Sequence, residues 1–321
     1  MFPKSHISQF DCQISQPIIL DMKYIACLVL AWLLVTLTYA RAEDPDDSRI
    51  IGQILQTRNA IINATGDSNA LFLAFWDFDG TTMKGDCSEG LREDGHLVYA
   101  GLAQLAIEHG LSEIYPADGG FEKFWNDYTN MDARIGHWLA YPFIAQMLRG
   151  AKVDDVSELS RHYFATTLSN YLRASSVRII GELKRGGVES HIVSASAELF
   201  VRGASASLDI PTKHIHGIQV KITEGRLTEE LVYPITWNIG KREKIQEVVA
   251  EAEHREVGKK VYVLAGFGDS YHTDGPFLEY IAKQPLPAGK TISVFYDNTN
   301  VPVEYRGLFY QASHRATVSG K

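Results

Sequence analysis

An apolar run that leads directly into two aspartates, at residues 71–82, constrains the fold of this chain more than any other stretch. Residues 71–76 are all apolar and lack the polar alternation of a half-exposed strand. This pattern is typical of a strand buried on both faces, as in a parallel sheet. Asp77 and Asp79 then stand at its carboxyl end, where open α/β sheets bind ligands. Gly80 permits a sharp turn that brings backbone N–H groups close to an anion.

The rest of the chain predicts more strands of this kind, separated by helices. Apolar runs recur after residue 187, and segments with helical periodicity lie between them. Strands that alternate with helices imply a doubly wound parallel sheet of the α/β class. We expect strands at 188–194, 261–265 and 292–296, a β-hairpin from 214–221 and 227–233, and helices at 48–63, 176–184 and from about 239 to 250.

Residues 85–172 predict a long helical insertion directly after the first strand and its aspartates. We expect helices at 97–107, 121–130, 135–148 and 154–172, with Pro142 breaking or kinking the third, and no strand among them. The catalytic core is then expected to consist of residues 48–84 and 173–321.

Four motifs follow one another along the core, and all but the lysine come after a predicted strand. The motifs are Asp77-Phe78-Asp79-Gly80-Thr81, Ser194, Lys241 and Gly268-Asp269-Ser270-x-x-x-Asp274. Parallel strands bring their carboxyl ends to one edge, so these motifs should meet there. In this order they resemble the haloacid dehalogenase superfamily of phosphohydrolases, over residues 71–296. The insertion resembles the α-helical cap of the phosphoserine-phosphatase-like branch, which includes exported phosphorylcholine phosphatases.

The resemblance implies a Mg²⁺-dependent phosphomonoesterase that acts on a small phosphorylated metabolite. Asp77 is expected to be the nucleophile that forms an aspartyl-phosphate intermediate. Asp79 is expected to protonate the leaving oxygen and then to accept a proton from the attacking water. The resemblance also implies that Mg²⁺ is bound by Asp77, the backbone carbonyl of Asp79, and Asp269.

The remaining motif residues are expected to bind phosphate. The resemblance implies that Ser194 donates to a phosphoryl oxygen and that Lys241 neutralises its charge. Gly80 and Thr81 belong to the same phosphate-binding set. Asp274 is expected to orient Lys241 or the metal shell, and it is also consistent with a cap of a helix that starts near residue 276.

Two of these positions have competitors nearby. Ser196 lies two residues beyond Ser194, and the expected end of the strand favours Ser194. Lys244 lies one turn after Lys241 and is consistent with a solvated helix residue, whereas the glycine before Lys241 favours that lysine.

The insertion contains features that bear on the substrate. Asp86 lies nine residues after Asp77, where resembling phosphoserine phosphatases have an acid that meets the substrate's amino group. An acid beside aromatic rings would attract a cationic head group. Asp86 is equally consistent with the start of the first helix of the insertion. Most of the aromatic residues are expected in the core of the insertion; they are Trp125, Tyr128, Trp138 and Tyr141.

Several other classes fit the residues less well. A dehalogenase of the same fold needs neither a second aspartate nor a metal, so Asp79 and Asp269 disfavour it. Cys87 has no histidine partner nearby in sequence, and as the one cysteine beyond residue 42 it cannot form an internal disulfide. The alternative function is a non-catalytic or phosphotransfer protein of the same fold that binds a small phosphorylated ligand.

Residues 1–42 resemble a secretory signal peptide rather than part of the fold. Residues 24–40 carry no charge, Lys23 precedes them, and Ala40-Arg41-Ala42 has small residues where a signal peptidase cleaves. If Met22 is the true start, the signal peptide is 22–42. We expect export to the periplasm or medium and no stable membrane insertion after cleavage; the alternative is anchoring by an uncleaved helix.

The overall charge restricts the partners. The formal net charge is −8, and no long run of Lys and Arg is present. This balance disfavours nucleic acid and anionic membrane surfaces. The expected partner is a small-molecule phosphomonoester, and the oligomeric state is left open.

Overall fold

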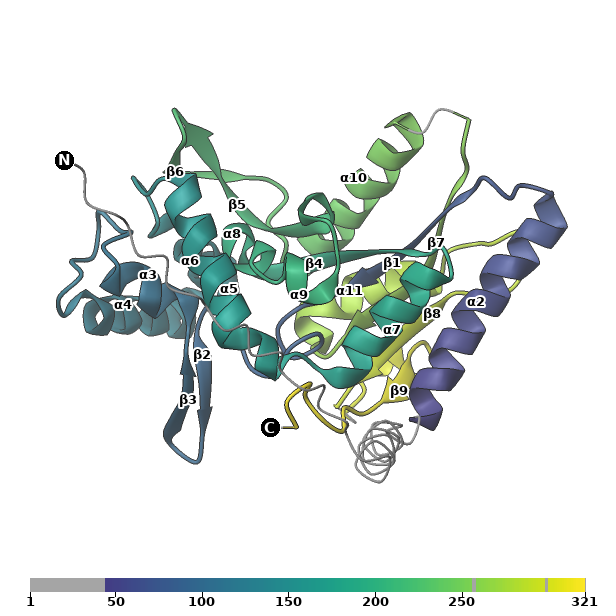
Figure 1. Ribbon diagram of the computed structural model, residues 1–321, viewed down its shortest axis with the longest axis horizontal. Helices are drawn as coiled ribbons and strands as arrows, with labels where there is room; N and C mark the ends of the chain where they lie inside the picture. The colour runs from purple at the N-terminus through teal and green to yellow at the C-terminus, as the bar shows by residue number, and fades with distance from the viewer. Residues whose placement is uncertain (1–43, 256–257, 298–299, 321) are drawn as a thin grey trace, which may run out of the picture. The chain divides into compact units, whose positions relative to one another are not determined.

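A mostly parallel sheet forms the centre of the fold (Figure 1). The computed structural model describes residues 44–255, 258–297 and 300–320. Within these ranges the predicted doubly wound α/β class is confirmed. Neighbouring strands are parallel, apart from the antiparallel pair at one edge. The order is β6 (Arg226–Val232), β5 (Ile215–Thr223), β4 (Glu189–Ala197), β1 (Leu71–Trp76), β7 (Val261–Gly268), β8 (Ile292–Tyr296) and β9 (Tyr310–Ala312).

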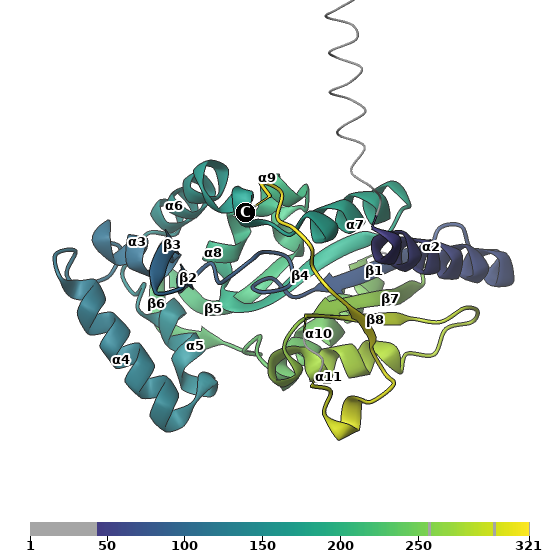
Figure 2. The ribbon, with the colours of Figure 1, turned by 90° about the horizontal axis from the view of Figure 1, so that it is seen from below.

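Helices cover both faces of the sheet, which explains why β1 is apolar throughout (Figure 2). Phe72, Ala74 and Trp76 pack on one face. Leu73 and Phe75 pack on the other, because side chains alternate along a strand. The first face is covered by α2 (Pro45–Thr65) and α7 (Ala174–Arg185), and the second by α10 (Ile239–Arg255) and α11 (Tyr271–Ala282).

The helix predicted at 48–63 is confirmed and is longer at its amino end. The side chain of Asp44 accepts a hydrogen bond from the backbone N–H of Asp46, which caps the helix. Pro45 occupies the first turn, where its missing N–H costs nothing. These capping residues lie before residue 48, in a polar stretch where the sequence predicts no helix.

The expectation that no strand interrupts residues 85–172 is wrong. Strands β2 (Gly90–Glu93) and β3 (His96–Ala100) pair as an antiparallel hairpin. The connecting residues Asp94 and Gly95 have φ angles of 49° and 80°. Positive φ at both positions is the requirement of a two-residue hairpin turn, for which Asp-Gly is well suited. The helix expected at 97–107 is therefore confined to α3 (Leu102–Glu108).

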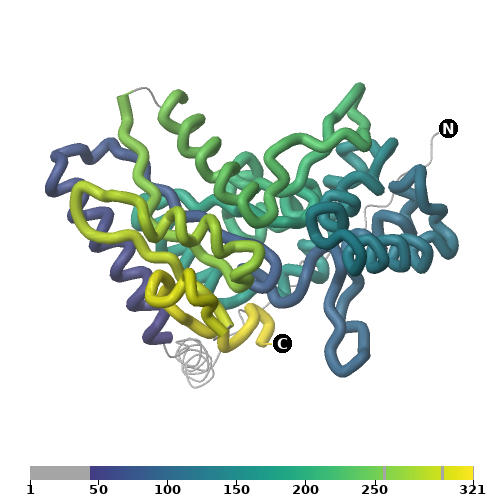
Figure 3. Tube along the Cα trace, turned by 180° about the vertical axis from the view of Figure 1, so that it is seen from behind, coloured from purple at the N-terminus to yellow at the C-terminus, as the bar shows by residue number. Residues whose placement is uncertain are grey.

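The other helices of the insertion are confirmed with shifted bounds. They are α4 (Gly120–Ile135), α5 (His137–Gln146), α6 (Val153–Thr166) and the 3₁₀ helix η1 (Leu168–Tyr171). Pro142 lies inside α5, and the chain breaks instead at Gly136, whose φ is 94°. Figures 1 and 3 show the insertion beside the β5–β6 hairpin, at the end of the sheet away from α2. Residues Asp44–Lys321 form one compact unit, so the division into core and cap stays a prediction.

The remaining elements are short and connect the sheet strands. They are α8 (Glu198–Arg202), α9 (Ser205–Leu208), and the 3₁₀ helices η2 (Thr212–His214) and η3 (Val303–Tyr305). Strand β9 has no counterpart among the predicted strands. The expected signal peptide lies outside the described residues. From residue 44 onwards, no described helix combines the length and apolar character needed to cross a membrane.

Candidate active site

The carboxyl ends of three adjacent strands enclose an acidic cavity of about 160 Å³. Strand β1 lies between β4 and β7, so residues from distant parts of the sequence meet at this edge. The predicted convergence of the motifs is therefore found. The polar wall of the cavity includes Asp77, Asp79, Asp86, Glu89, Ser196 and Asp269.

Asp77 is held in place by a buried cation at the base of the cavity. The Lys241 Nζ donates to Asp77 Oδ1 at 2.5 Å and to Asp274 Oδ1 at 2.7 Å. Lys241 is completely buried. Burial alone would lower the pKa of Lys241, but the charges of Asp274 and Asp77 raise it overall, so the lysine stays cationic.

The structure brings Lys241 into the site and leaves Lys244 outside it. Lys244 Nζ pairs with Glu247 Oε2 at 2.6 Å along α10. Asp274 does not cap a helix that starts near residue 276, because α11 begins at Tyr271 and Ser270 caps it. Instead Asp274 Oδ2 accepts the backbone N–H groups of Asp269 and Ser270 at 3.1 Å each.

Asp79 lies among hydrogen-bond donors in the wall of the same cavity. Its Oδ1 accepts the backbone N–H of Cys87 at 2.7 Å, and its Oδ2 accepts the hydroxyl of Ser196 at 2.7 Å. Burial, followed by the negative charge of Asp86, raises the pKa of Asp79 well above its usual range. A raised pKa is the direction that a general acid requires, because it favours the protonated form.

The structural reason for preferring Ser194 to Ser196 is wrong. Strand β4 continues to Ala197, so Ser194 does not end it. Ser196 lines the cavity. Ser194 is fully buried behind it, accepting the Ser196 N–H at 3.0 Å and donating to Asp79 Oδ2 at 3.3 Å. Both hydroxyls thus reach Asp79, and the assignment of the phosphate contact stays a prediction.

Gly80 and Thr81 support Asp269 rather than lining the cavity. The Thr81 hydroxyl donates to Asp269 Oδ1 at 3.1 Å. The backbone N–H of Gly80 donates to the carbonyl of Gly85 at 3.1 Å. A Cβ atom on Gly80 would overlap Asp269 Oδ2, so glycine allows the first motif to approach the last.

The carboxylates at the base of the cavity fit a hard divalent cation. Ligand oxygens of Asp77, Asp269 and Asp274 lie within 4.8 Å of one another. Burial and the charges of Asp77 and Asp274 raise the pKa of Asp269 well above its usual range. Three carboxylates beside Lys241 leave negative charge uncompensated, and oxygen ligands of this kind are those that Mg²⁺ prefers.

Asp86 and Glu89 form an acidic wall beside the predicted nucleophile. Asp86 does not start a helix; its Oδ1 accepts the N–H groups of Ser88 and Glu89 at 2.7 and 2.8 Å and so closes a turn before β2. Glu89 Oε1 accepts the hydroxyl of Tyr128 on α4. Burial and the charge of Asp86 raise the pKa of Glu89 to about 7.

The aromatic residues of the insertion divide between core and surface. Tyr128 is buried, whereas Trp125 and Trp138 are exposed, so the expectation of a common core is wrong for the two tryptophans. Tyr141 lines the cavity, because α5 turns it toward the acidic wall. No sequence motif marks it. In the sequence, Tyr141 occupies a position whose helical periodicity is that of an ordinary core residue.

Cys87 is buried against Asp79, and burial raises the pKa of its thiol well above its usual range. A thiol that stays protonated is a poor nucleophile. The geometry therefore does not support Cys87 as a nucleophile.

Comparisons with known proteins agree with this architecture. The family model described as haloacid dehalogenase-like hydrolase matches residues 74–279. A protein with unknown function from Bordetella pertussis Tohama I is 15% identical, with a TM-score of 0.51 over 72% of this chain and 92% of that chain. Cytosolic 5'-nucleotidase IIIB bound to cytidine is 14% identical, with a TM-score of 0.52 over 83% and 84% of the two chains. No curated protein matches the sequence. These structural similarities show a common fold.

Proposed function

Because the chain belongs to the haloacid dehalogenase-like hydrolase family, we propose that it is a Mg²⁺-dependent phosphomonoesterase for a small phosphorylated metabolite. The observation that carries the proposal is a pair of carboxylates with different neighbours in one cavity. Asp77 accepts a hydrogen bond from the buried cation of Lys241, whereas burial and the charge of Asp86 raise the pKa of Asp79. Two carboxylates in different environments suit nucleophilic attack and general acid catalysis.

The proposed reaction has two steps. In the first, an Asp77 oxygen bonds to phosphorus while the ester P–O bond breaks, and the Asp79 proton passes to the leaving oxygen. In the second, water attacks phosphorus, the P–O bond to Asp77 breaks, and Asp79 takes the proton from the water. The products are the free alcohol and inorganic phosphate, and both aspartates return to their starting states.

Positive charge must offset the repulsion between a phosphate dianion and this acidic cavity. Lys241 supplies part of it next to Asp77. Asp77 and Asp269 would hold Mg²⁺, together with the backbone carbonyl of Asp79. The bound ion supplies the remaining charge and brings phosphate and nucleophile together.

The experiment compares the wild type with Asp77→Asn and the matched control Asp118→Asn. Asp118 is exposed, and its substitution leaves the cavity intact. With Mg²⁺ present, the wild type and the control should release phosphate from p-nitrophenyl phosphate. Asp77→Asn should lose about 10³-fold or more of kcat. If the wild type binds the phosphate ester but releases no inorganic phosphate, the non-catalytic alternative is supported. If Asp77→Asn has activity near that of the wild type, the mechanism is refuted.

We further infer that the leaving group carries a positive charge. Asp86 and Glu89 face the cavity beside the ring of Tyr141, and an acidic and aromatic wall attracts amines and quaternary ammonium groups. Asp86→Asn removes the charge but keeps an oxygen for the two turn N–H groups, whereas Asp86→Ala removes both. Asp86→Asn should raise KM for phosphocholine by about tenfold and leave KM for p-nitrophenyl phosphate unchanged. Asp86 would be purely structural if Asp86→Asn left both KM values unchanged while Asp86→Ala impaired activity equally on both substrates.

A further inference from the structure

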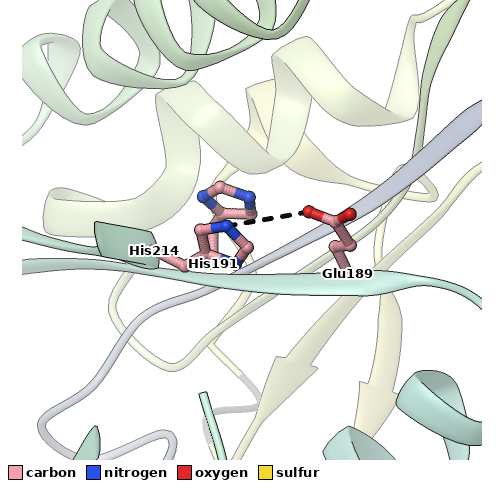
Figure 4. Close-up of side chains that lie close together, drawn as sticks. All are labelled: Glu189, His191 and His214. Atoms are coloured by element: carbon pink, nitrogen blue, oxygen red, sulfur yellow. Dashed lines mark ion pairs between the residues drawn. The ribbon is translucent and has the colours of Figure 1, made fainter. Parts of the chain in front are cut away.

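A second group of metal-ligand side chains lies on the sheet, away from the acidic cavity. Glu189 and His191 are two residues apart on β4 and therefore project from the same face. The register pairs Val193 with His216 of β5, which sets His214 alongside His191. Figure 4 shows the two imidazole rings one over the other, with the Glu189 carboxylate directed at them.

The distances between these groups suit a common ion once the two stacked rings tilt so that their lone pairs converge. Glu189 Oε2 lies 3.7 Å from His214 Nε2. One ligand atom from each of Glu189, His191 and His214 lies within 4.8 Å of the other two. Two ligands at about 2.1 Å from a tetrahedral ion are separated by about 3.4 Å, so each needs to move by roughly 1 Å. The Glu189 side chain is 43% exposed, which leaves room for this movement.

Both imidazoles are shielded from solvent, with His191 5% and His214 7% exposed. Burial lowers the pKa of each ring. A neutral imidazole presents the lone pair that a metal ion binds. The neighbouring charges of Lys213 and Arg255 act in the same direction, and the carboxylate of Glu189 is the counter-charge that a divalent ion would use.

A hydrogen bond behind the cluster orients His191. Its Nδ1 lies 3.2 Å from Nε2 of His216, with the two rings nearly coplanar at 2°. When His191 Nδ1 donates to His216, the lone pair of His191 is on Nε2. Histidines that bind metals commonly donate their other ring N–H in this way, which fixes the tautomer.

We propose that Glu189, His191 and His214 form a metal site for a zinc-type divalent cation, distinct from the catalytic Mg²⁺ site. Two neutral imidazoles and a carboxylate match the ligand preference of Zn²⁺, whereas Mg²⁺ prefers oxygen ligands alone. The cluster lies at the beginning of β4, while Ser196 lies at its end beside the cavity. A bound ion would therefore link β4 to the segment before β5 and stabilise the sheet.

The test measures Zn²⁺ binding by equilibrium dialysis with the purified full chain in excess Mg²⁺. The same measurement is made on Asp269→Asn, which lacks one of the proposed Mg²⁺ ligands of the cavity. Zinc bound in the cavity would be weakened by this change, whereas zinc bound at β4 would not. We expect one Zn²⁺ per chain in both proteins and a rise in Tm on Zn²⁺ addition. Glu189→Gln and His214→Gln should each lower the affinity at least tenfold, because a ligand is lost.

The matched control is His162→Gln, since His162 is exposed on α6, away from the cluster. It should bind zinc like the wild type. Glu189→Gln decides the question if His214→Gln fails to fold, because the Glu189 side chain is not part of the core. The proposal is overturned if Glu189→Gln keeps wild-type zinc affinity, or if the zinc is lost in Asp269→Asn instead.

Discussion

Gly80 has a backbone conformation and a neighbour that together exclude other residues. Its φ is 85°, and an added Cβ atom would overlap the carboxylate of Asp269. Gly95 has a similar φ of 80°, yet open space surrounds it. Both Gly→Ala variants therefore have the same backbone strain, of about 1–2 kcal/mol. Only Gly80→Ala should displace Asp269, weaken Mg²⁺ activation and reduce kcat by about 100-fold.

The measurements for this pair are kcat as a function of Mg²⁺ concentration and the free energy of unfolding. Gly95→Ala serves as the control for strain and should retain wild-type kcat. If both variants lose activity equally, strain rather than the contact with Asp269 explains the requirement for glycine.

Lys241 is the centre of a buried charge cluster, so its removal should cost stability as well as activity. Without it, Asp77 and Asp274 are left buried and unpaired. In the absence of Mg²⁺, Lys241→Met should lower the free energy of unfolding by about 3–5 kcal/mol. Lys244→Met is the matched variant; its ion pair with Glu247 is partly exposed and should contribute at most about 1 kcal/mol. Urea unfolding of both variants checks this, and similar losses would contradict the assignment of Lys241.

Glu89 lies directly before β2 and accepts a hydrogen bond from Tyr128 of α4, and the stability of this contact depends on pH. Its pKa in the folded protein is about 7, against 4.5 for an unperturbed Glu. The folded state therefore binds this proton more tightly, so its stabilising effect is complete below about pH 4.5 and is lost as pH rises to about 7. This difference corresponds to about 3 kcal/mol.

Glu89→Gln keeps a neutral partner for Tyr128 and removes this titration. The wild type should lose about 3 kcal/mol of unfolding free energy relative to Glu89→Gln between pH 4.5 and 7, measured by urea unfolding. Glu122→Gln, at an exposed position of α4, should follow the wild type at every pH. Parallel pH profiles for the wild type and Glu89→Gln would show that Glu89 titrates normally.

For the molecule as a whole, we propose that the chain is exported and that the mature protein begins near Glu43. The reasons are the uncharged run at 24–40 and the small residues of Ala40-Arg41-Ala42. Protein recovered outside the cytoplasm of its native host should have an intact mass that lacks residues 1–42. A mass that includes residues 22–42 would instead support the anchored alternative.

Local patterns in the sequence were enough to predict the sheet and most of the site. The apolar residues 71–76 specify a strand buried on both faces, because no polar side chain in them needs water. Because parallel strands bring their carboxyl ends to one edge of the sheet, Asp77, Asp79 and Asp269 are expected to lie together there, whatever the details of packing. The hairpin of β5 and β6 agrees with the alternation that predicts it, whereas the hairpin of β2 and β3 lies partly in residues 97–107, whose periodicity favours a helix.

By itself, therefore, the sequence determined the α/β class and the placement of Asp77 and Asp79 directly after a buried strand, because both depend on local periodicity and chain order. The tertiary structure alone decided where β4 ends, since its last residue, Ala197, is defined by pairing with Ile218 of β5. Pairing between β4 and β5 also brings His191 and His214 together, although they are far apart in the sequence. Such contacts follow from strand register and burial, which no short stretch of the chain specifies.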